Sequence, residues 1–510
     1  MYSKMTMKNQ FAVSLVLFVT SGLVAQENLG PFRSISSVTN VAKTQEDDQD
    51  VDWKAEFEKL EYRLRELEDD VVSQNSGLSE DRVSRDDFSE STTSELKELS
   101  KTVESLSKSV SKFEDTLPNL VFHRRKGGPR LELFGRIHTS YFAFPDVESG
   151  ISPLFGGNPE DTFGFRRVRL GAMGDLNDNI FYRIQTEFAD PNDFQFRDVF
   201  IGIRDLPLLN TVIIGNHKRP YNLDQLNSSN ANVFLDRPFV ADAFNDSARR
   251  FGVSTNNHTE DLRFNYRSGV FNLENIQNNG AFFGDDYQLE VGSRFATTAW
   301  YDEHSGGRGY LHLGVSSAHR FPDGNGTNNL AEYSSNAEAL TPNILATGPI
   351  AGADSDSLYG LEAVLNIGSF QVGAEYMETF VDRGPVASNL NFHGGYIYAS
   401  YLLTGEHMPW NRKRGTLGQV QPFENFFAVR DCDCNVGRGW GAWQIAARYS
   451  YLDLNDEDIA GGQADSLTLG LNWWWNRYSR MQFNYVNGDI DRAAFEGKYD
   501  ITGLQFEVFF

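Results

Sequence analysis

The chain has 510 residues, with 46 basic and 70 acidic side chains, a formal net charge of −24 and a mean hydropathy of −0.43. No run of 18 or more apolar residues occurs, which excludes a helical membrane protein, and the acidic balance argues against nucleic acid as a partner. Aromatic residues make up 13% of the chain and glycine occurs 45 times, which suits the aromatic girdles and tight turns of a β-barrel.

The first 25 residues have the pattern of a secretory signal peptide. Lys4 and Lys8 precede a short apolar core, Phe11 to Val19, and small residues follow it. We therefore expect cleavage after Ala25. The alternative is a buried helix of a cytosolic protein.

Residues 26–120 are predicted to form a coiled-coil region in the periplasm. Apolar residues recur there at alternating spacings of three and four, from Trp53 to Val71 and again from Leu96 to Leu117. The polar stretch 73–93 between the two seams predicts a break. The alternative is a pair of amphipathic helices that fold on one another within one chain. A linker, residues 121–130, follows.

From residue 131 to 510 the pattern changes to short segments in which apolar and polar residues alternate between Gly, Asn and Asp turns. This predicts an all-β transmembrane barrel of 16 antiparallel strands, an even number, as a closed barrel with both ends in the periplasm requires. The predicted strands are 131–144, 162–174, 179–190, 194–204, 209–216, 248–255, 261–277, 286–303, 308–321, 355–366, 368–381, 391–404, 438–453, 463–476, 478–488 and 500–510. Two long connections, Asn216–Asp246 and Arg320–Ser355, are expected outside the cell, whereas Gly405–Gly437 is long and falls on the periplasmic side.

The last ten residues, 501–510, carry the clearest alternation. Leu504, Phe506, Val508 and Phe510 share one face, and Gln505 and Glu507 lie between them. A strand that ends on an aromatic residue is typical of bacterial outer-membrane barrels. Trp473, Trp474 and Trp475 beside a turn predict an aromatic girdle at a membrane interface. A soluble sandwich would also alternate, but it would bury its apolar face against a second sheet.

Enzyme motifs are absent from the sequence, which has no HExxH, no GxxxxGK and no GxSxG pattern. We expect no catalytic site, no cofactor and no metal. Asp323, Asn325 and Thr327 are spaced like the start of a calcium loop, but the closing acid is not in place, so a solvated loop is the preferred interpretation. Cys432 and Cys434, the two cysteines, are interpreted as a tolerated pair in a loop, oxidised or reduced, because a bridge between them would be strained.

Several segments closely resemble the phosphate-selective porin O and P family. These are YASYLLTGE (398–406), GAWQIAARYSYLDL (441–454) and LTLGLNWWWN (467–476), with further similarity at 163–176 and 214–229. The resemblance covers residues 131–510 and implies a trimeric sixteen-stranded porin of the outer membrane. It also implies that the third and fifth external loops and a periplasmic segment fold into the lumen, for which the three long connections are candidates.

The resemblance implies a ladder of arginines that leads anions to a lysine-lined constriction. The matching or supporting basic residues are Arg136, Arg166, Arg167, Arg169, Arg183, Lys218, Arg219 and Arg237. A guanidinium is always charged and offers forked donors to oxyanions. Alternation puts Arg169 on the same face as Arg167 and turns Arg166 to the other face. The alternative is that such arginines pair with Asp198 or Glu187 and merely neutralise the strand surface.

The third loop carries Gln225 where the family has its phosphate-binding lysine, with Asn230 nearby, and the fifth loop has no basic residue from Asp323 to Glu338. Phosphate selectivity therefore stays open. Two functions are predicted from the sequence. One is a passive channel for small solutes, mainly anions such as phosphate. The other is a structural envelope protein, whose coiled coil contacts the cell wall and tethers the outer membrane while the barrel anchors it in lipid.

Overall fold

The computed structural model describes residues 120–123, 129–190, 194–277, 284, 287–326, 328–385, 387–430 and 436–510. The predicted signal peptide, nearly all of the predicted coiled-coil region and both cysteines lie outside these residues. The chain divides into two compact units, 1–115 and 116–510, and the fold below is that of the second. In the described part, no helix combines the length and the apolar character needed to cross a membrane.

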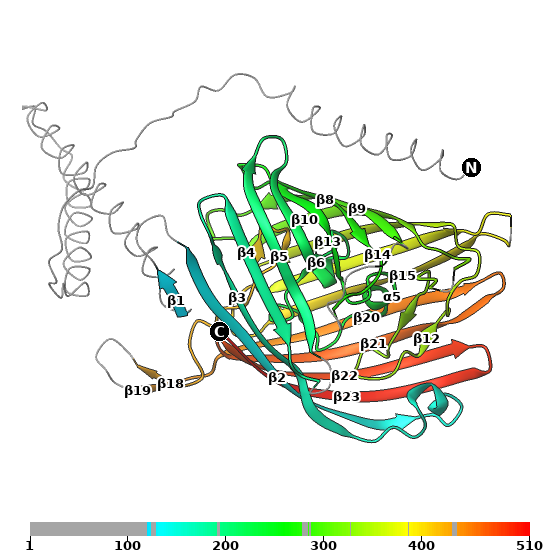
Figure 1. The fold of residues 1–510 in the computed structure, drawn as a ribbon. Helices are drawn as coiled ribbons and strands as arrows, with labels where there is room; N and C mark the ends of the chain where they lie inside the picture. The colour runs from blue at the N-terminus through cyan, green and yellow to red at the C-terminus, as the bar shows by residue number, and fades with distance from the viewer. Residues whose placement is uncertain are drawn as a thin grey trace, which may run out of the picture. The chain divides into compact units, whose positions relative to one another are not determined.

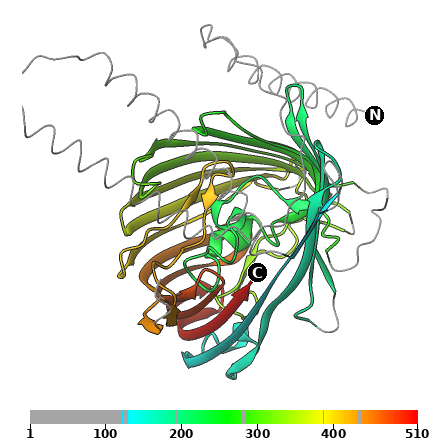
Figure 2. The ribbon, with the colours of Figure 1, turned by 90° about the vertical axis from the view of Figure 1, so that its left-hand side faces the viewer.

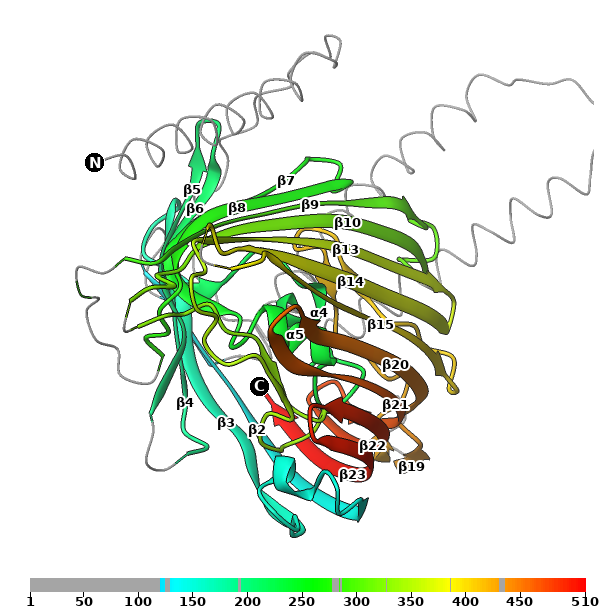
Figure 3. The ribbon, with the colours of Figure 1, turned by 90° about the vertical axis from the view of Figure 1, so that its right-hand side faces the viewer.

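Sixteen antiparallel strands close into a barrel, which Figures 1 and 3 show from two sides. They are β2 (Arg130–Val147), β3 (Thr162–Asp175), β4 (Ile180–Glu187), β5 (Gln195–Leu206), β6 (Asn210–Lys218), β7 (Arg249–His258), β8 (Phe264–Asn272), β9 (Leu289–Tyr301), β10 (Gly309–Phe321), β13 (Ser355–Ile367), β14 (Phe370–Asp382), β15 (Leu390–Leu402), β20 (Ala442–Asp456), β21 (Ile459–Asn476), β22 (Ser479–Arg492) and β23 (Phe495–Phe509). Each strand pairs with its neighbour along the chain, and β2 pairs with β23 to close the ring, with Arg136 opposite Phe509. The prediction of sixteen strands is confirmed, and every predicted range overlaps one of them.

The closing seam depends on a glycine. Gly135 exchanges two backbone hydrogen bonds with Phe510, of 2.9 and 3.1 Å, and the Phe510 ring lies against it. A Cβ atom at Gly135 would meet that ring at 2.6 Å, so a larger residue would displace it. A short strand that the sequence did not predict, β1 (Leu120–His123), pairs with the start of β2.

The faces of the barrel follow the period-two pattern. In β23, Gln505 and Glu507 are each 1% exposed and point into the lumen, whereas Phe506 and Val508 are 40% and 49% exposed on the outside. The exposed residues of a barrel of this type are thus its apolar ones, because the lumen rather than a second sheet covers the polar face. The predicted alternation of the last strand is confirmed.

The predicted aromatic girdle includes two of the three consecutive tryptophans. Trp473 stacks on Trp443 with ring centroids 4.7 Å apart, and its centroid lies 5.7 Å from that of Trp475, on the outer face. Trp474 is 1% exposed and points inward, under the guanidinium of Arg480. Alternation separates the three because neighbouring residues of a strand face opposite sides.

Most of the strand connections at one end of the barrel, such as 176–179 and 368–369, are short. At the opposite end, loop L3 (219–248) holds α4 (Leu223–Leu226) and α5 (Phe239–Phe244), and loop L5 (322–354) holds β11 (Ser334–Ser335) and β12 (Leu345–Ala346). The exception at the short-turn end is residues 403–441, called the inner segment. The inner segment holds β16 (Trp410–Asn411), β17 (Thr416–Leu417), β18 (Phe427–Arg430) and β19 (Val436–Gly439), and the first loop carries the 3-10 helix η1 (Ser152–Phe155).

All three long connections enter the lumen, as Figure 2 shows for the helices of L3. Leu223 of L3 donates its backbone N–H to Glu375 on β14 (2.8 Å), and Arg492 on β22 donates to the carbonyl of Ile344 in L5 (2.9 Å). In the inner segment, Trp410 donates its indole N–H to Thr298 on β9 (3.2 Å). The expectation that these three connections fold inward is met by these contacts.

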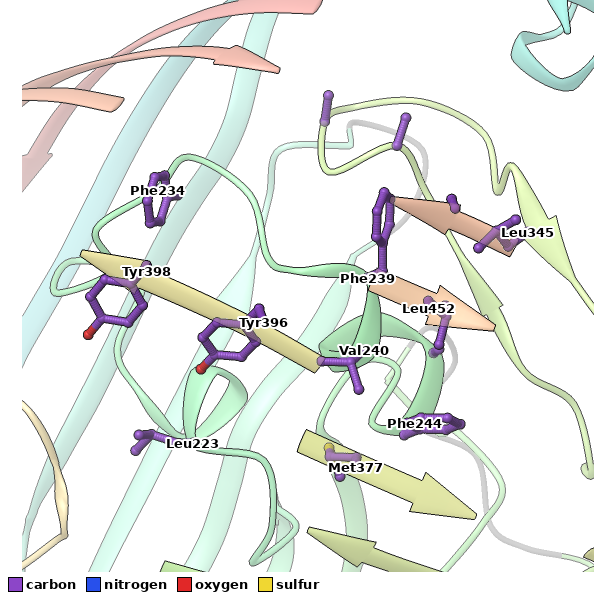
Figure 4. Close-up of a cluster of buried hydrophobic side chains, with 14 of the residues drawn as sticks. Leu223, Phe234, Phe239, Val240, Phe244, Leu345, Met377, Tyr396, Tyr398 and Leu452 are labelled. Carbon is purple, nitrogen blue, oxygen red and sulfur yellow. The ribbon is translucent and has the colours of Figure 1, made fainter. Parts of the chain in front are cut away.

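An apolar cluster fixes the loops to one side of the barrel (Figure 4). Phe239, Val240 and Phe244 of α5 lie with Leu345 of L5 and Leu452 of β20, and each is at most 3% exposed. Around them are Met377, Tyr396 and Tyr398 from β14 and β15. This packing occupies the side of β14 to β22, and a cavity lies along the opposite wall.

Candidate functional site

The open space is a cavity of about 1050 Å³ between the wall formed by β2 to β8 and the inserted loops. Every one of those seven consecutive strands contributes at least one basic side chain. They are Arg136 on β2, Arg166, Arg167 and Arg169 on β3, Arg183 on β4, Arg197 on β5, Lys218 on β6, Arg249 on β7 and Arg267 on β8. With Arg237 of L3 and with Lys413 and Arg414 of the inner segment, twelve basic and six acidic residues line the cavity. A positive lumen therefore lies inside a chain of strongly negative net charge.

A β-bulge in β3 brings Arg166 into the lumen. His138 of β2 faces Arg167, but the next residue, Thr139, faces Phe165, so Arg166 is the extra residue. Phe165 points outward at 63% exposure, and Arg166 and Arg167 both line the cavity. The expectation that Arg166 points away from the lumen is wrong, because the bulge shifts the alternation by one position.

A second bulge acts in the same way on β5. Ile184 of β4 faces Val199 and Thr186 faces Phe196, which leaves Arg197 and Asp198 together opposite Gln185. Both Arg197 and Asp198 line the cavity. Each bulge thus adds one inward arginine to the wall, which a regular strand would have turned toward the outside.

Four of the wall arginines share two carboxylates. Arg169 and Arg197 lie 2.5 and 3.8 Å from Glu187, and Arg249 and Arg183 lie 2.7 and 3.5 Å from Asp198. Pairing with Asp198 and Glu187, the alternative that the sequence left open, therefore holds for this group. Because four guanidinium groups face two carboxylates, the patch still carries a positive surplus.

Three other basic residues of the wall are held by neutral groups. Arg136 donates to Ser229 Oγ (2.6 Å), Arg167 lies 3.4 Å from His138 Nδ1, and Lys218 donates to the carbonyl of Asn227 (2.8 Å). Within the described ranges, none of the three forms an ion pair with a carboxylate. Their charge is thus available to a solute in the lumen.

Loop L3 forms the side of the cavity opposite the wall of β2 to β8. Arg237 pairs with the Asp224 carboxylate (2.5 Å), and Asp236 pairs with Arg166 (3.2 Å). Gln225 lines the cavity and donates to the carbonyl of Ala241 (3.3 Å). Asn230 does not belong to the lining.

Arg219 is placed elsewhere. It is 3% exposed, donates to Glu290 (2.9 Å) and to the carbonyl of Asp246 (3.0 Å), and its guanidinium lies 5.2 Å over the Tyr221 ring. It fixes the stem of L3 and does not line the cavity. The other seven residues of the predicted ladder do line it.

The sequence analysis missed five basic residues of the lining, Arg197, Arg249, Arg267, Lys413 and Arg414. Arg249 and Arg267 could have been predicted from the alternation of side chains, because both lie within predicted strands. Arg197 depends on its bulge. Lys413 and Arg414 depend on the fold of the inner segment, where Arg267 donates to the carbonyl of Arg414.

Among the described residues, no group of three or more His, Cys, Asp or Glu side chains is arranged to hold a metal ion. Asp323 and Asn325, the predicted start of a calcium-like loop, lie in L5, and Thr327 lies outside the described residues.

Asp242 of α5 gives the cavity a titratable group near neutral pH. Burial, followed by the charge of Asp236, raises the pKa of Asp242 to about 8, although Arg237 and Arg166 act in the opposite direction. Its carboxylate accepts from Asn336 (3.0 Å), and it lines the cavity.

Raising the pH through about 8 is therefore expected to ionise Asp242 and to reduce the positive surplus of the lumen. The anion-over-cation permeability ratio should fall by about fivefold between pH 6 and pH 9, because one charge several ångströms away in water is worth about 0.5 kcal/mol to each ion, with opposite signs. Reversal potentials in a salt gradient measure this ratio. Asp242→Asn should keep the ratio high at pH 9, and parallel pH profiles for the two proteins would contradict the assignment.

The chain is similar in sequence to several known proteins. The model of the phosphate-selective porin O and P family matches residues 146–508. An uncharacterized protein of Caulobacter vibrioides is 30% identical over 348 residues, which cover 64% of this chain and 63% of that protein. Porin O of Pseudomonas aeruginosa is 24% identical over 226 residues, which cover 38% of this chain and 49% of that protein. The chain thus spans less than two thirds of the length of either relative.

Two solved structures cover most of this chain at low identity. The anion-selective porin from Comamonas acidovorans has a TM-score of 0.44 at 14% identity and covers 75% of this chain and 100% of its own. The outer membrane channel DcaP of Acinetobacter baumannii has a TM-score of 0.46 at 12% identity and covers 77% of this chain and 100% of its own.

Proposed function

We propose that this chain, which belongs to the phosphate-selective porin O and P family, forms a passive channel of the outer membrane for small anions. The observation that carries the proposal is the charge of the cavity, whose lining has twice as many basic as acidic residues although the chain as a whole is acidic. An anion in the cavity meets Arg136, Arg167 and Lys218, none of which forms an ion pair with a carboxylate in the described part of the chain. A cation meets the same charges as a barrier.

Planar-bilayer recording tests this proposal. The purified protein should insert as an open channel, and in a potassium chloride gradient its reversal potential should show preference for chloride. A preference for potassium would overturn the role of the arginines. A barrel that inserts and never conducts would instead favour the structural alternative, in which the coiled coil tethers the envelope.

General anion selectivity is favoured over a phosphate site in L3. Gln225 stands where the family has a lysine, and its amide already donates within L3. The part of L5 that reaches the cavity supplies neutral residues, namely Ser334, Asn336, Leu340 and Asn343. A phosphate ion would therefore find its basic partners on the barrel wall.

We further propose that the protein assembles as a homotrimer, with the region before the barrel in the periplasm. Both follow from membership of the family and from the signal-peptide pattern of residues 1–25. Light scattering of the detergent-solubilised protein, corrected for bound detergent, should give three copies per particle. Removal of residues 26–115 would show whether the coiled coil contributes to assembly.

A further inference from the structure

The inner segment leaves the lumen at the rim of the barrel. Leu417 still lies in the lumen, where its backbone N–H donates to the side chain of Asn227 in L3 (2.9 Å). Two residues later, Gln419 donates to the carbonyl of Arg477 in the turn between β21 and β22. The segment therefore crosses the rim at the short-turn end, beside these two strands.

Beyond the rim, the segment packs on the aromatic girdle of the outer face. Phe426 donates its backbone N–H to the carbonyl of Trp475 (2.6 Å), and its ring centroid lies 4.5 Å from that of Trp473. The carbonyl of Trp440 accepts from the indole N–H groups of Trp473 (2.8 Å) and Trp443 (3.1 Å). Figure 1 shows β18 and β19, which lie between these contacts in the sequence, outside the ring of barrel strands. Both ends of this stretch are thus fixed to the girdle.

Four aromatic side chains of this part of the inner segment are exposed. Phe423 is 67% exposed, Phe426 40%, Phe427 63% and Trp440 75%. We call these four residues the aromatic platform. An exposed apolar patch of this kind marks a contact with a membrane or with another protein. Because the platform continues the girdle, and lipid surrounds the girdle of a transmembrane barrel, lipid is the expected cover of the platform as well.

The polar groups of the same stretch set the depth at which it can lie. The backbone from 421 to 426 forms neither strand nor helix, and Glu424 and Asn425 are exposed among the rings. Irregular backbone and an exposed carboxylate are not tolerated in the hydrocarbon region of a bilayer. Aromatic rings with polar neighbours are instead enriched at the level of the headgroups. The platform therefore fits the headgroup region and not the acyl chains.

We propose that the aromatic platform is a membrane anchor of the inner segment, seated among the phospholipid headgroups of the leaflet at the short-turn end of the barrel. The inner segment is then held at two places, by the contact of Leu417 with L3 in the lumen and by lipid outside the barrel. The inference requires a barrel that spans a membrane, but it does not depend on the anion preference of the channel.

The accessibility of a nitroxide spin label measures the depth of the platform. The full chain, with Cys432→Ser and Cys434→Ser, is labelled at Phe427→Cys and reconstituted into liposomes of phosphatidylethanolamine and phosphatidylglycerol. Asp178→Cys, in an exposed turn at the short-turn end, is the water reference, and Leu361→Cys, 59% exposed on β13, is the hydrocarbon reference. Single-channel conductance equal to that of the wild type shows that each labelled protein folds.

The ratio of oxygen accessibility to nickel-chelate accessibility at position 427 should lie between those of the two references and several-fold above the water reference. A ratio equal to the water reference would place the platform in the aqueous phase and overturn the proposal. A label that neither reagent reaches would show that protein covers the platform, a second copy of the chain included, and would overturn it as well. The proposed function fails on a different result, namely a reversal potential that shows cation preference.

Removal of the rings tests whether they hold the segment in the membrane. With the label at Asn425→Cys, the change of Phe423 and Trp440 together to serine should lower the accessibility ratio to that of the water reference. The matched control changes Phe163 and Phe165 to serine, which removes two exposed aromatic rings from the outer end of β3 and should leave the ratio at position 425 unchanged. Equal ratios in the two double variants would show that the rings do not anchor the segment. The label at position 427 tests the proposal independently of whether the platform variant folds.

Discussion

Replacing Glu338 by alanine is expected to lower the free energy of unfolding by about 3–5 kcal/mol. This is the cost of leaving a buried charge, that of Arg448, without its partner. Glu338 of L5 is 2% exposed, and its carboxylate accepts from Arg448 (2.7 Å), Ser466 (2.9 Å) and Thr468 (3.1 Å) on the barrel wall. It also accepts from the backbone N–H of Phe239 at the start of α5 (3.1 Å). One side chain therefore joins L5, L3 and the strands β20 and β21.

Loss of the contacts made by the Glu338 carboxylate should also raise the single-channel conductance. Arg448, itself 2% exposed, donates to the carbonyl of Asp236, so its displacement releases L3 as well as L5 from the wall. The space that the two loops occupy would then become accessible to ions. Thermal unfolding in detergent and single-channel recording measure the two effects.

Glu332→Ala is the matched control, since Glu332 lies in the same loop and is exposed. It should change neither the unfolding temperature nor the conductance. The double variant Glu338→Met with Arg448→Met should recover most of the stability, because a buried ion pair replaced by apolar groups of similar size leaves no unpaired charge. If the Glu338→Ala protein had the unfolding temperature and the single-channel conductance of the wild type, the apolar cluster alone would hold L3 and L5 in the lumen.

The barrel was predictable from the sequence because one simple rule governs it. Each strand has the lumen on one face and an apolar exterior on the other, so polar and apolar residues alternate along it. This alternation can be recognised without tertiary information. The last strand, with Gln505 and Glu507 against Phe506 and Val508, is the clearest case. The number of strands came from counting the alternating segments, parity tested that count, and connection length separated the two ends.

The site was predictable only in part because two kinds of feature break that rule. A bulge inserts one residue, and the sequence around Arg166 or Arg197 does not indicate it. The face of the strand on which each of these arginines lies could therefore not be predicted. Contacts of the inserted loops join residues far apart in the chain, such as Glu338 and Arg448, which are 110 positions apart. Arg219 shows the opposite error. It was predicted to line the pore, but it forms a buried ion pair with Glu290 instead.

Selectivity should depend strongly on Arg136, Arg167 and Lys218, three wall residues that form no ion pair with a carboxylate within the described ranges. Changing Arg136, Arg167 and Lys218 together to glutamine is expected to lower the anion-over-cation permeability ratio on the order of a hundredfold, because each charge acts by about 0.5 kcal/mol on the anion and by the same amount with opposite sign on the cation. Arg167→Ala alone should lower the ratio about fivefold for the same reason. Among the described residues, none of these changes leaves a carboxylate without an ion-pair partner, so the strands should keep their structure.

The measurement is the reversal potential in a potassium chloride gradient, taken at low and at high ionic strength. The difference between the triple variant and the wild type should shrink toward 1 M salt, where the screening length falls to about 3 Å. The double variant Arg237→Gln with Asp224→Asn removes an ion pair from the same cavity without changing the net charge, and it should keep the wild-type ratio. If that neutral double change reduced anion preference as strongly as the triple one, the shape of L3 rather than the charge of the wall would set the selectivity.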